Sequence, residues 1–306
     1  MNTLKRLPDD FAVLILTHGR PNNVRTYSTL RSSGYTGRIV LVVDDEDKTL
    51  AEYEANYPGE VVVFNKKAIA DRTDEGDNFD DRRTITHARN ASYDVAESLG
   101  IRWFVQLDDD YTNFSFRTDA TGQYPKKQFK VRSKLDLIFV SVLAFYVKSG
   151  ASCVALAQGG DFIGGKENQH VTNPTLRRKC MNSFFCCTNR RVWFVGRMNE
   201  DVNTYTSLGR VGVLFFTIPL VNLDQLATQS NPGGISETYK AYGTYVKSFY
   251  TVMFSPSCTK VSMMNTKHAR IHHAIEWRNA VPVILRREHA SRGYADSRHE
   301  NDGEGA

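Results

Sequence analysis

The sequence predicts an α/β fold: a mixed, mainly parallel sheet flanked by helices, with antiparallel strands added in the second half. The first third alternates runs of Val, Ile and Leu with amphipathic segments, the pattern of parallel strands covered on both faces. Later segments are aromatic and β-branched, which favours further strands. With 306 residues, 41% of them hydrophobic and 24% charged, the chain is long enough to bury a sizeable core.

The elements of the first third follow one another in regular order. Helical spacing of Ile85, Ala88, Ala91, Val95 and Leu99 predicts a further helix, which Gly100 ends. The expected elements are a strand in 11–18, a helix in 22–34, a strand in 38–47, a helix in 50–58, a strand in 60–65, a helix in 85–99 and a strand in 102–110.

The alternation loosens after Tyr111. The segments 113–119 and 126–134 are typical of a connection. A buried helix is expected in 135–150, a strand running into a glycine-rich loop in 152–165, and further strands in 182–188, 211–221 and 245–254. We expect a single domain over 1–285, made of an N-terminal half (1–120) and a C-terminal half (121–285). Residues 286–306 have almost no apolar content, so we expect them to form a flexible tail.

Composition limits the possible classes of protein. The net charge of +5 and the pI near 8.9 are compatible with a polyanionic partner but are common in proteins that never bind nucleic acid. The five cysteines lack disulfide or CxxC spacing, so reduced thiols are expected. Since the N-terminus lacks a signal cleavage pattern and the apolar run 137–147 is too short to span a bilayer, a cytoplasmic protein is expected.

Three consecutive carboxylates end the strand "WFVQLDDD". Neighbouring Asp side chains repel one another unless a cation lies among them. Asp108 and Asp110 are spaced so that both can approach one Mg²⁺ or Mn²⁺ ion, which a nucleotide diphosphate would complete, with Asp109 turned to other contacts. The alternative is an acidic turn that caps the next element.

Two earlier strands also end in polar residues. In "THGRP" at 17–21, Arg20 and the following helix N-terminus could receive an anion or a nucleobase edge, although an ordinary βα turn would suit Gly19 and Pro21. In "VDDED" at 43–47, Asp44 and Asp45 could bind ribose hydroxyls, while Asp47 could simply cap the next helix.

Further candidates lie in the second half. Glu200 and Asp201 come at the start of an expected helix, where either could be a general base or only an acidic first turn. Asp161, among four glycines, lies in a loop that could close on a ligand or form a hairpin. His272 could add a nitrogen ligand to the metal, as could His268 or His273. The sequence has no GxGxxG and no P-loop motif.

Several blocks occur together in order over residues 11 to 285, and in them the chain resembles the TET-associated DNA glycosyltransferases of bacteriophages, which are of the GT-A (Rossmann-like) type. The blocks are "ILTHGRPNNVRTYSTLRSSGYTGRIVLVVDDED", "LDDDYTNF", "AQGGDFIGGKE", "MNSFFC", "GRMNEDVNTY", "TQSNPGGISETY", "GTYVKSFYTVMFSPSC" and "HHAIEW".

The resemblance implies transfer of a sugar from a UDP-sugar to the hydroxyl of a 5-hydroxymethylpyrimidine, 5-hydroxymethylcytosine above all, in phage DNA. It places the metal, Mn²⁺ or Mg²⁺, on Asp108, Asp110 and His272, and the base at Asp201 with Glu200 beside it. A retaining enzyme would need no such base. The nucleotide-sugar residues it implies are Thr17, His18, Arg20, Asp44, Asp45, Asp109 and Asp161.

The DNA itself would meet basic and aromatic residues in the second half. The candidate contacts are Lys126, Lys127, Arg177, Arg178 and Trp193. Two other functions stay open: a GT-A enzyme that acts on a protein or small-molecule hydroxyl, and a nucleic-acid-binding module without activity. The transferred sugar, the stereochemistry, the DNA context and the oligomeric state do not follow from the sequence.

Overall fold

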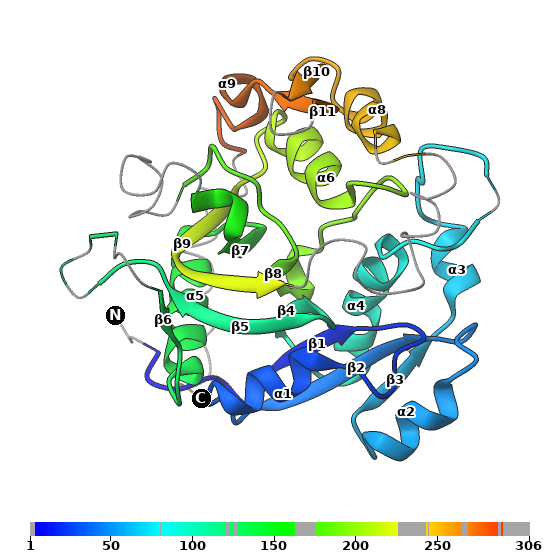
Figure 1. Cartoon of the computed structure of the whole chain (residues 1–306), viewed down its shortest axis with the longest axis vertical. Coiled ribbons are helices and arrows are strands. Elements are labelled where there is room, and N and C mark those ends of the chain that lie inside the picture. The colour runs from blue at the N-terminus through cyan, green and yellow to red at the C-terminus, as the bar shows by residue number, and fades with distance from the viewer. Residues whose placement is uncertain are drawn as a thin grey trace, which may run out of the picture.

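The main feature of the computed structural model is one large sheet (Figure 1). The structure describes residues 4–79, 81–119, 121, 123–124, 128–162, 175–225, 243, 245–264, 269–286 and 289. Within them, nine strands pair in the order β3-β2-β1-β4-β8-β7-β9-β5-β6. These strands are β1 (Phe11–Leu16), β2 (Arg38–Asp44), β3 (Val61–Phe64), β4 (Trp103–Asp108), β5 (Tyr111–Phe116), β6 (Phe129–Lys130), β7 (Cys153–Gln158), β8 (Ser183–Cys187) and β9 (Phe215–Gln225).

The first half of the sheet is parallel. Strands β3, β2, β1 and β4 run in the same direction, with Leu16 of β1 paired to Asp108 of β4. All six residues of β1 are apolar and buried, because a central parallel strand is covered on both faces. The carboxyl ends of these strands therefore meet at one edge, as the sequence predicts.

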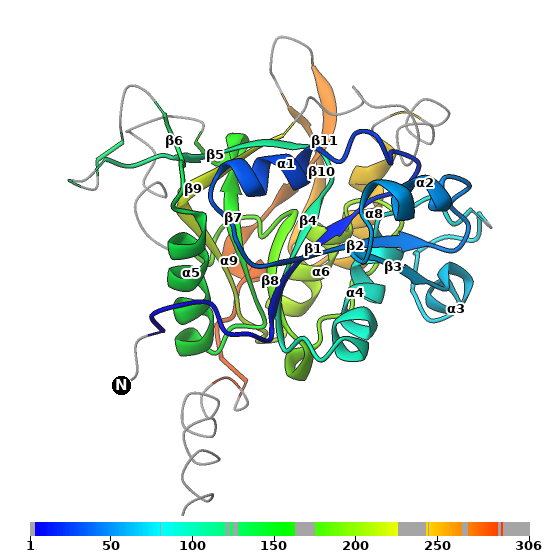
Figure 2. The same cartoon turned by 90° about the horizontal axis from the view of Figure 1, so that it is seen from below.

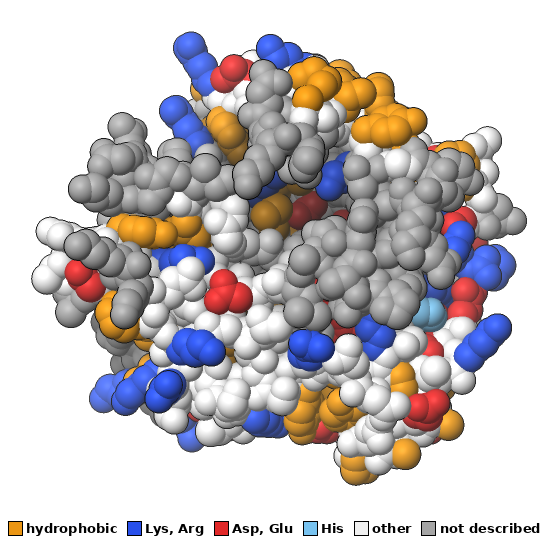
Figure 3. All heavy atoms as spheres, viewed as in Figure 1, with side chains coloured by type: hydrophobic (Ala, Val, Ile, Leu, Met, Phe, Trp, Pro, Cys, Tyr) orange, Lys and Arg blue, Asp and Glu red, His pale blue; other side chains and the backbone are white. Residues whose placement is uncertain are grey.

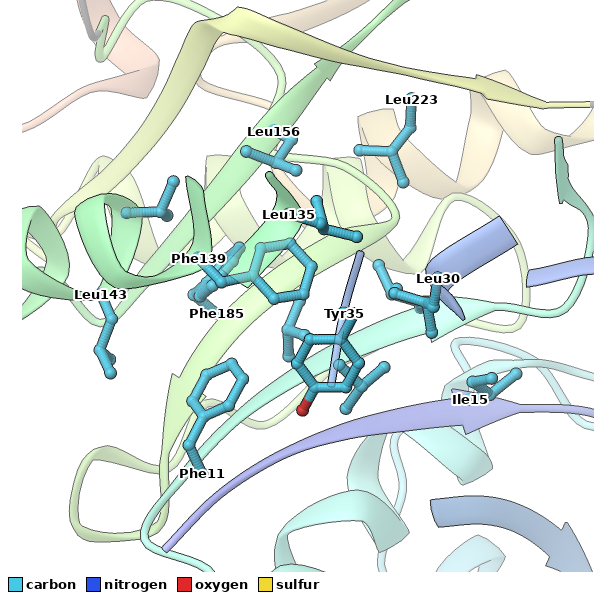
Figure 4. Packing of buried hydrophobic residues seen from close by; sticks show 14 of the residues in the cluster. Phe11, Ile15, Leu30, Tyr35, Leu135, Phe139, Leu143, Leu156, Phe185 and Leu223 are labelled. Atoms are coloured by element: carbon cyan, nitrogen blue, oxygen red, sulfur yellow. The ribbon is translucent and has the colours of Figure 1, made fainter. Parts of the chain in front are cut away.

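Helices cover both faces of this sheet (Figures 1 and 2). The odd-numbered residues of β1 belong to a core that contains Leu30 of α1 and Phe139 of α5 (Figure 4). The even-numbered ones belong to a second core, with Val95 of α4 and Val202 of α6. The helices are α1 (Arg25–Ser32), α2 (Leu50–Asn56), α3 (Lys66–Ala70), α4 (Thr86–Ser98), α5 (Leu135–Ser149), α6 (Glu200–Gly209), α8 (Val246–Phe254) and α9 (Trp277–Ala280), with short 3-10 turns η1 (Gly159–Phe162) and η3 (Thr188–Arg190).

The second half brings in antiparallel pairing. Strand β8 lies antiparallel to both β4 and β7, and β5 lies antiparallel to β9 and β6, while β7 and β9 are parallel. A separate antiparallel hairpin is formed by β10 (Thr259–Met264) and β11 (Arg270–Ile275). The α/β fold class with antiparallel strands added in the second half is therefore confirmed.

Two expectations for the second half were wrong. The segment 113–119, expected as a connection, is largely strand β5, because its Phe114 is buried and its backbone pairs with the distant β9. The segment 245–254, expected as a strand, is largely helix α8, which buries Ser248 and Thr251 one turn apart. Side-chain packing overrides β propensity there.

The expected tail begins with residues that contact the body of the protein. The backbone N–H of Arg286 donates to the carbonyl of Gly212 (3.4 Å), and the His289 ring lies 3.1 Å from the carbonyl of Gly150. The rest of 287–306 lies outside the described residues. All five cysteines are free and buried.

Candidate functional site

Polar residues follow β1, β2 and β4 at the point where each strand ends. The backbone N–H of Thr17 still donates to the carbonyl of Val42 (3.3 Å), so the loop after β1 begins beside β2. Asp108 is the last residue of β4 and lies across from Leu16. The carboxyl edge of the parallel strands therefore gathers the residues that the sequence predicts as a site, as in other open α/β sheets.

Asp109 turns into the first cluster of this edge. Its Oδ2 accepts a hydrogen bond from Thr17 (2.7 Å) and its Oδ1 accepts one from Arg20 Nη1 (2.8 Å). The hydroxyl of Tyr53 lies 2.7 Å from Thr17 Oγ1 and accepts from the backbone N–H of Arg20 (2.8 Å). Burial raises the pKa of Asp109, although Arg20 and Thr17 oppose the rise. Arg20 is thus fixed at the strand edge, with its Nε buried and without a hydrogen bond.

Asp44 is the centre of a second cluster. Its Oδ2 lies 2.7 Å from His18 Nδ1 and its Oδ1 lies 3.2 Å from Lys66 Nζ. Burial would raise the pKa of Asp44, but the His18 hydrogen bond and the Lys66 charge outweigh it and lower that pKa. The same hydrogen bond raises the pKa of His18. Asp45 instead accepts from the backbone N–H of Lys66 (2.9 Å), and Asp47 accepts from that of Gly19 (2.6 Å).

Arg89 of α4 joins Asp108 to Glu200. Its Nη2 lies 3.0 Å from Asp108 Oδ1, and its Nε lies 2.8 Å from Glu200 Oε1. The guanidinium is almost completely buried and lies over the Phe184 ring. Burial raises the pKa of Asp108 to about 7; Arg89 opposes the rise, and the charges of Asp110 and Glu200 add to it. The end of β4 and the start of α6 are therefore parts of one site.

Asp110 is the least satisfied carboxylate of the three. Its Oδ2 accepts from Gln225 Nε2 (3.3 Å), whereas its Oδ1 is buried without a hydrogen-bond partner. Burial and the neighbouring charge of Asp109 raise its pKa. A buried carboxylate oxygen without a donor costs free energy unless a cation or a ligand approaches it.

Asp201 lies beside Glu200 in the first turn of α6. Its Oδ1 accepts from the backbone N–H of Val202 (2.7 Å). Burial, with the charge of Glu200, raises its pKa to about 6. Such a carboxylate is ionised near neutral pH and basic enough to take a proton, which suits a general base.

Asp161 contacts Arg178, and His272 contacts His273. Asp161, in η1, accepts from Arg178 Nε (2.8 Å) and from the backbone N–H of Gln158 (2.9 Å). The His272 ring lies 4.2 Å, centroid to centroid, from His273, whose Nδ1 lies 3.3 Å from Asn199 Nδ2 just before α6. Within the described part of the chain, no three His, Cys, Asp or Glu side chains are placed to hold a metal. Asp108, Asp110 and His272 are thus not assembled as one ligand set, and His268 lies outside the described residues.

Sequence reasoning missed four residues of the site: Arg89, Asp47, Tyr53 and Lys66. The signal for Arg89 was present, because an Arg on the apolar face of a helix needs an acidic partner when buried. Asp47 was considered only as a helix cap, whereas it also fixes the backbone at Gly19. Tyr53 and Lys66 gave no local signal, since only the fold brings α2 and α3 to the edge.

Of the residues expected to contact DNA, Arg178 and Trp193 already contact other side chains of the protein. Arg178 is bound to Asp161, and Arg72 and Arg191 lie over the Trp193 ring at 5.5 and 5.1 Å. Lys126 and Lys127 lie outside the described residues. No described helix has both the length and the apolar character that crossing a membrane requires.

Solved structures similar to this chain include sugar transferases at low identity. A Pyrobaculum calidifontis mannosyltransferase with GDP-Man and Mn²⁺ is 12% identical (TM-score 0.48; 83% of this chain and 66% of that chain covered). Mycobacterium tuberculosis glucosyl-3-phosphoglycerate synthase with Mn²⁺, UDP and phosphoglyceric acid is also 12% identical (TM-score 0.46; 92% and 89% covered). No curated protein matches the chain.

A family model matches residues 11–234, well over half of the chain. It covers the strand edge, Arg89, the three Asp residues and the start of α6. The blocks "GTYVKSFYTVMFSPSC" and "HHAIEW" lie beyond its end. The chain therefore belongs to the TET-associated glycosyltransferase family and is a glycosyltransferase.

Proposed function

We propose that this glycosyltransferase moves a sugar from a UDP-sugar to the hydroxyl of a 5-hydroxymethylpyrimidine, 5-hydroxymethylcytosine foremost, in phage DNA, with the help of a divalent metal. The observation that carries the donor and metal part is the unsatisfied, buried Oδ1 of Asp110 next to Asp108, at the edge where the parallel strands end. The DNA acceptor is supported by the family description and by the basic charge of the chain.

The residues present fit a hard cation. Two carboxylates with raised pKa values, Asp108 and Asp110, are destabilised as anions by burial and by each other, so a cation between them would relieve the repulsion. Mg²⁺ and Mn²⁺ accept one or two carboxylates and complete their shell with water and phosphate oxygens. When bound, the metal neutralises charge on the leaving diphosphate. His272 stays a prediction as a further ligand.

The nucleotide would be held by the two clusters at the strand edge. Arg20 and His18 are the cationic or hydrogen-bonding groups there, and each is fixed by a buried carboxylate, Asp109 or Asp44. Thr17 and Asp45 hold this arrangement through their own hydrogen bonds. We assign these residues to the uridine and its ribose, and Asp161 to the loop beside the sugar.

Proton transfer would fall to Asp201. As the bond from the acceptor oxygen to the sugar carbon forms and the bond from that carbon to the diphosphate breaks, the carboxylate takes the hydroxyl proton. Glu200 is less suited because its Oε1 is bound to Arg89. The half over 1–120 would thus hold the donor, and the half over 121–285 the base and the acceptor.

Direct transfer tests the proposal. The protein, Mn²⁺ and UDP-glucose or UDP-N-acetylglucosamine are incubated with DNA containing 5-hydroxymethylcytosine, and the digested nucleosides are weighed by mass spectrometry. A nucleoside heavier by one sugar residue is expected. The Asp110→Asn variant should lose about 10²-fold of the rate or more, and removal of the metal with EDTA should do the same.

A matched variant and two other acceptors complete the test. Glu54→Gln, which removes an exposed carboxylate on α2, should transfer at the wild-type rate. If wild type modifies no DNA with either donor but glycosylates a protein or a small alcohol, the acceptor proposed here is wrong. An Asp110→Asn variant with full activity would remove the metal role.

A further inference from the structure

Helix α8 exposes a stripe of large apolar side chains. Tyr245, Phe249 and Met253 follow one another at intervals of four residues, which places them on one helical face, and they are 49%, 51% and 52% exposed. The rings of Tyr245 and Phe249 meet edge to face with centroids 6.4 Å apart. The opposite side of the helix buries Ser248, Tyr250 and Thr251. A surface helix usually turns charged and polar residues to solvent, so three large apolar side chains on this exposed face need a reason.

The neighbouring hairpin extends the apolar surface. Met263 of β10 lies opposite Ile271 of β11 and is 58% exposed, and Val261 is exposed next along the same face of β10. Figure 3 shows hydrophobic side chains gathered over α8 and β10. We call the residues Tyr245, Phe249, Met253, Val261, Met263 and Ile271 the α8–hairpin face.

The segment that carries this face is basic. Residues 243–286 contain six Lys or Arg and one Glu, a net charge of +5, equal to the net charge of the whole chain. The basic residues are Lys247, Lys260, Lys267, Arg270, Arg278 and Arg286.

Hydrogen bonds fix α8 to the start of α6. Asn199, directly before α6, donates from Nδ2 to the carbonyl of Lys247 (3.0 Å) and to Thr251 Oγ1 (3.1 Å). The hydroxyls of Thr206 and Ser255 lie 2.8 Å apart. The α8–hairpin face is thus held to the helix whose first turn contains Glu200 and Asp201.

From these observations we propose that the α8–hairpin face binds the acceptor DNA and presents its hydroxymethylated base to the site at the start of α6. The inference rests on the proposed function and names the surface that binds the acceptor. Aromatic rings and Met beside cations are the means by which proteins hold DNA strands whose bases are unstacked, since rings pack against bases and cations against phosphates. A strand with its target base out of the helix fits this chemistry best.

DNA affinity of the full chain tests the inference. A fluorescent oligonucleotide containing 5-hydroxymethylcytosine, single-stranded or duplex, is titrated and its anisotropy followed. Phe249→Ser with Met253→Ser should weaken binding about tenfold or more. Lys260→Glu should reduce the slope of log K against log salt by about 1. The matched controls are Val63→Ser with Leu137→Ser, exposed apolar residues outside this face, and Lys5→Glu; these should bind as wild type.

A second acceptor separates DNA binding from chemistry. In the Phe249→Ser, Met253→Ser variant, the rate of transfer to the free nucleoside 5-hydroxymethyldeoxycytidine should fall far less than the rate of transfer to DNA. The melting temperature of the variant shows whether it folds. If wild type glycosylates DNA while the variant binds DNA with unchanged affinity, this inference alone is overturned. If wild type glycosylates no DNA, the proposed function is overturned with it. A dimer in solution that the variant dissociates, with DNA affinity unchanged, would assign the face to a second copy of the chain instead.

Discussion

Arg89 shows how one buried side chain links two distant segments of the site. It forms an ion pair with Asp108 and another with Glu200. Burying three charges costs free energy that only their mutual attraction offsets. Asp108, Glu200 and Asp201 could be found from the sequence because they follow a strand or begin a helix, whereas the pairing through Arg89 is a contact between residues about a hundred positions apart.

Removing this arginine should destabilise the fold. Arg89→Leu leaves the buried Glu200 and the partly buried Asp108 without their cation, so the free energy of unfolding in urea should fall by about 3 kcal/mol or more. Adding Glu200→Gln removes one of those charges and should restore part of the loss in a double-mutant cycle. A single variant within about 0.5 kcal/mol of wild type would contradict the role given to this bridge.

At the scale of elements, the segment before α4 is tied through Asp77 to the segment before α6 and to α8. Its carboxylate accepts from Nε and Nη2 of Arg197 (2.8 and 2.9 Å) and from the hydroxyl of Tyr250. Burial would raise the pKa of Asp77, but these donors outweigh it and lower that pKa. One carboxylate thus joins three segments of the chain, including the helix that we expect to bind DNA.

The lowered pKa fixes the direction of a pH effect. A carboxyl whose folded-state pKa lies below its unfolded value of about 3.9 stabilises the fold above that value and loses this contribution as the pH falls through the folded-state pKa. Asp77→Asn should therefore lower the free energy of unfolding by about 1 to 3 kcal/mol at pH 7 and by less at pH 3. Urea unfolding at both pH values measures this, with Asp9→Asn as the exposed control. An equal loss at both would show that the carboxylate charge does not matter.

For the whole molecule, the donor and the metal should stabilise the fold. The reason is that the protein leaves Oδ1 of Asp110, in the run Asp108 to Asp110, without a hydrogen-bond partner. A ligand that binds only the folded state adds about 2.7 kcal/mol at one hundred times its dissociation constant. Mn²⁺ with UDP should therefore raise the melting temperature of wild type, while Asp110→Asn should show little of this rise. The thermal melts include UDP alone and EDTA as reference conditions. An equal rise of the melting temperature in the variant would exclude Asp110 as a metal ligand.

Local patterns determined much of this protein. The buried strands, the helices α1, α2, α4, α5 and α6, and the position of the Asp108 to Asp110 run follow from apolar periodicity and from where the periodicity stops. These are short-range properties that each segment carries by itself. The family model matches residues 11–234, which contain most of the sequence blocks that carry the resemblance.

Only the tertiary structure decided the remainder. The segment 113–119 forms a strand because it pairs with the distant β9. The segment 245–254 forms a helix that is bonded to the residue before α6. Burial and charge in the assembled site set the pKa values of Asp108 and Asp201. The same packing left an apolar face of α8 exposed in a basic segment of the chain. Local sequence determines the elements, and long-range contacts decide which charges meet and which surfaces stay open.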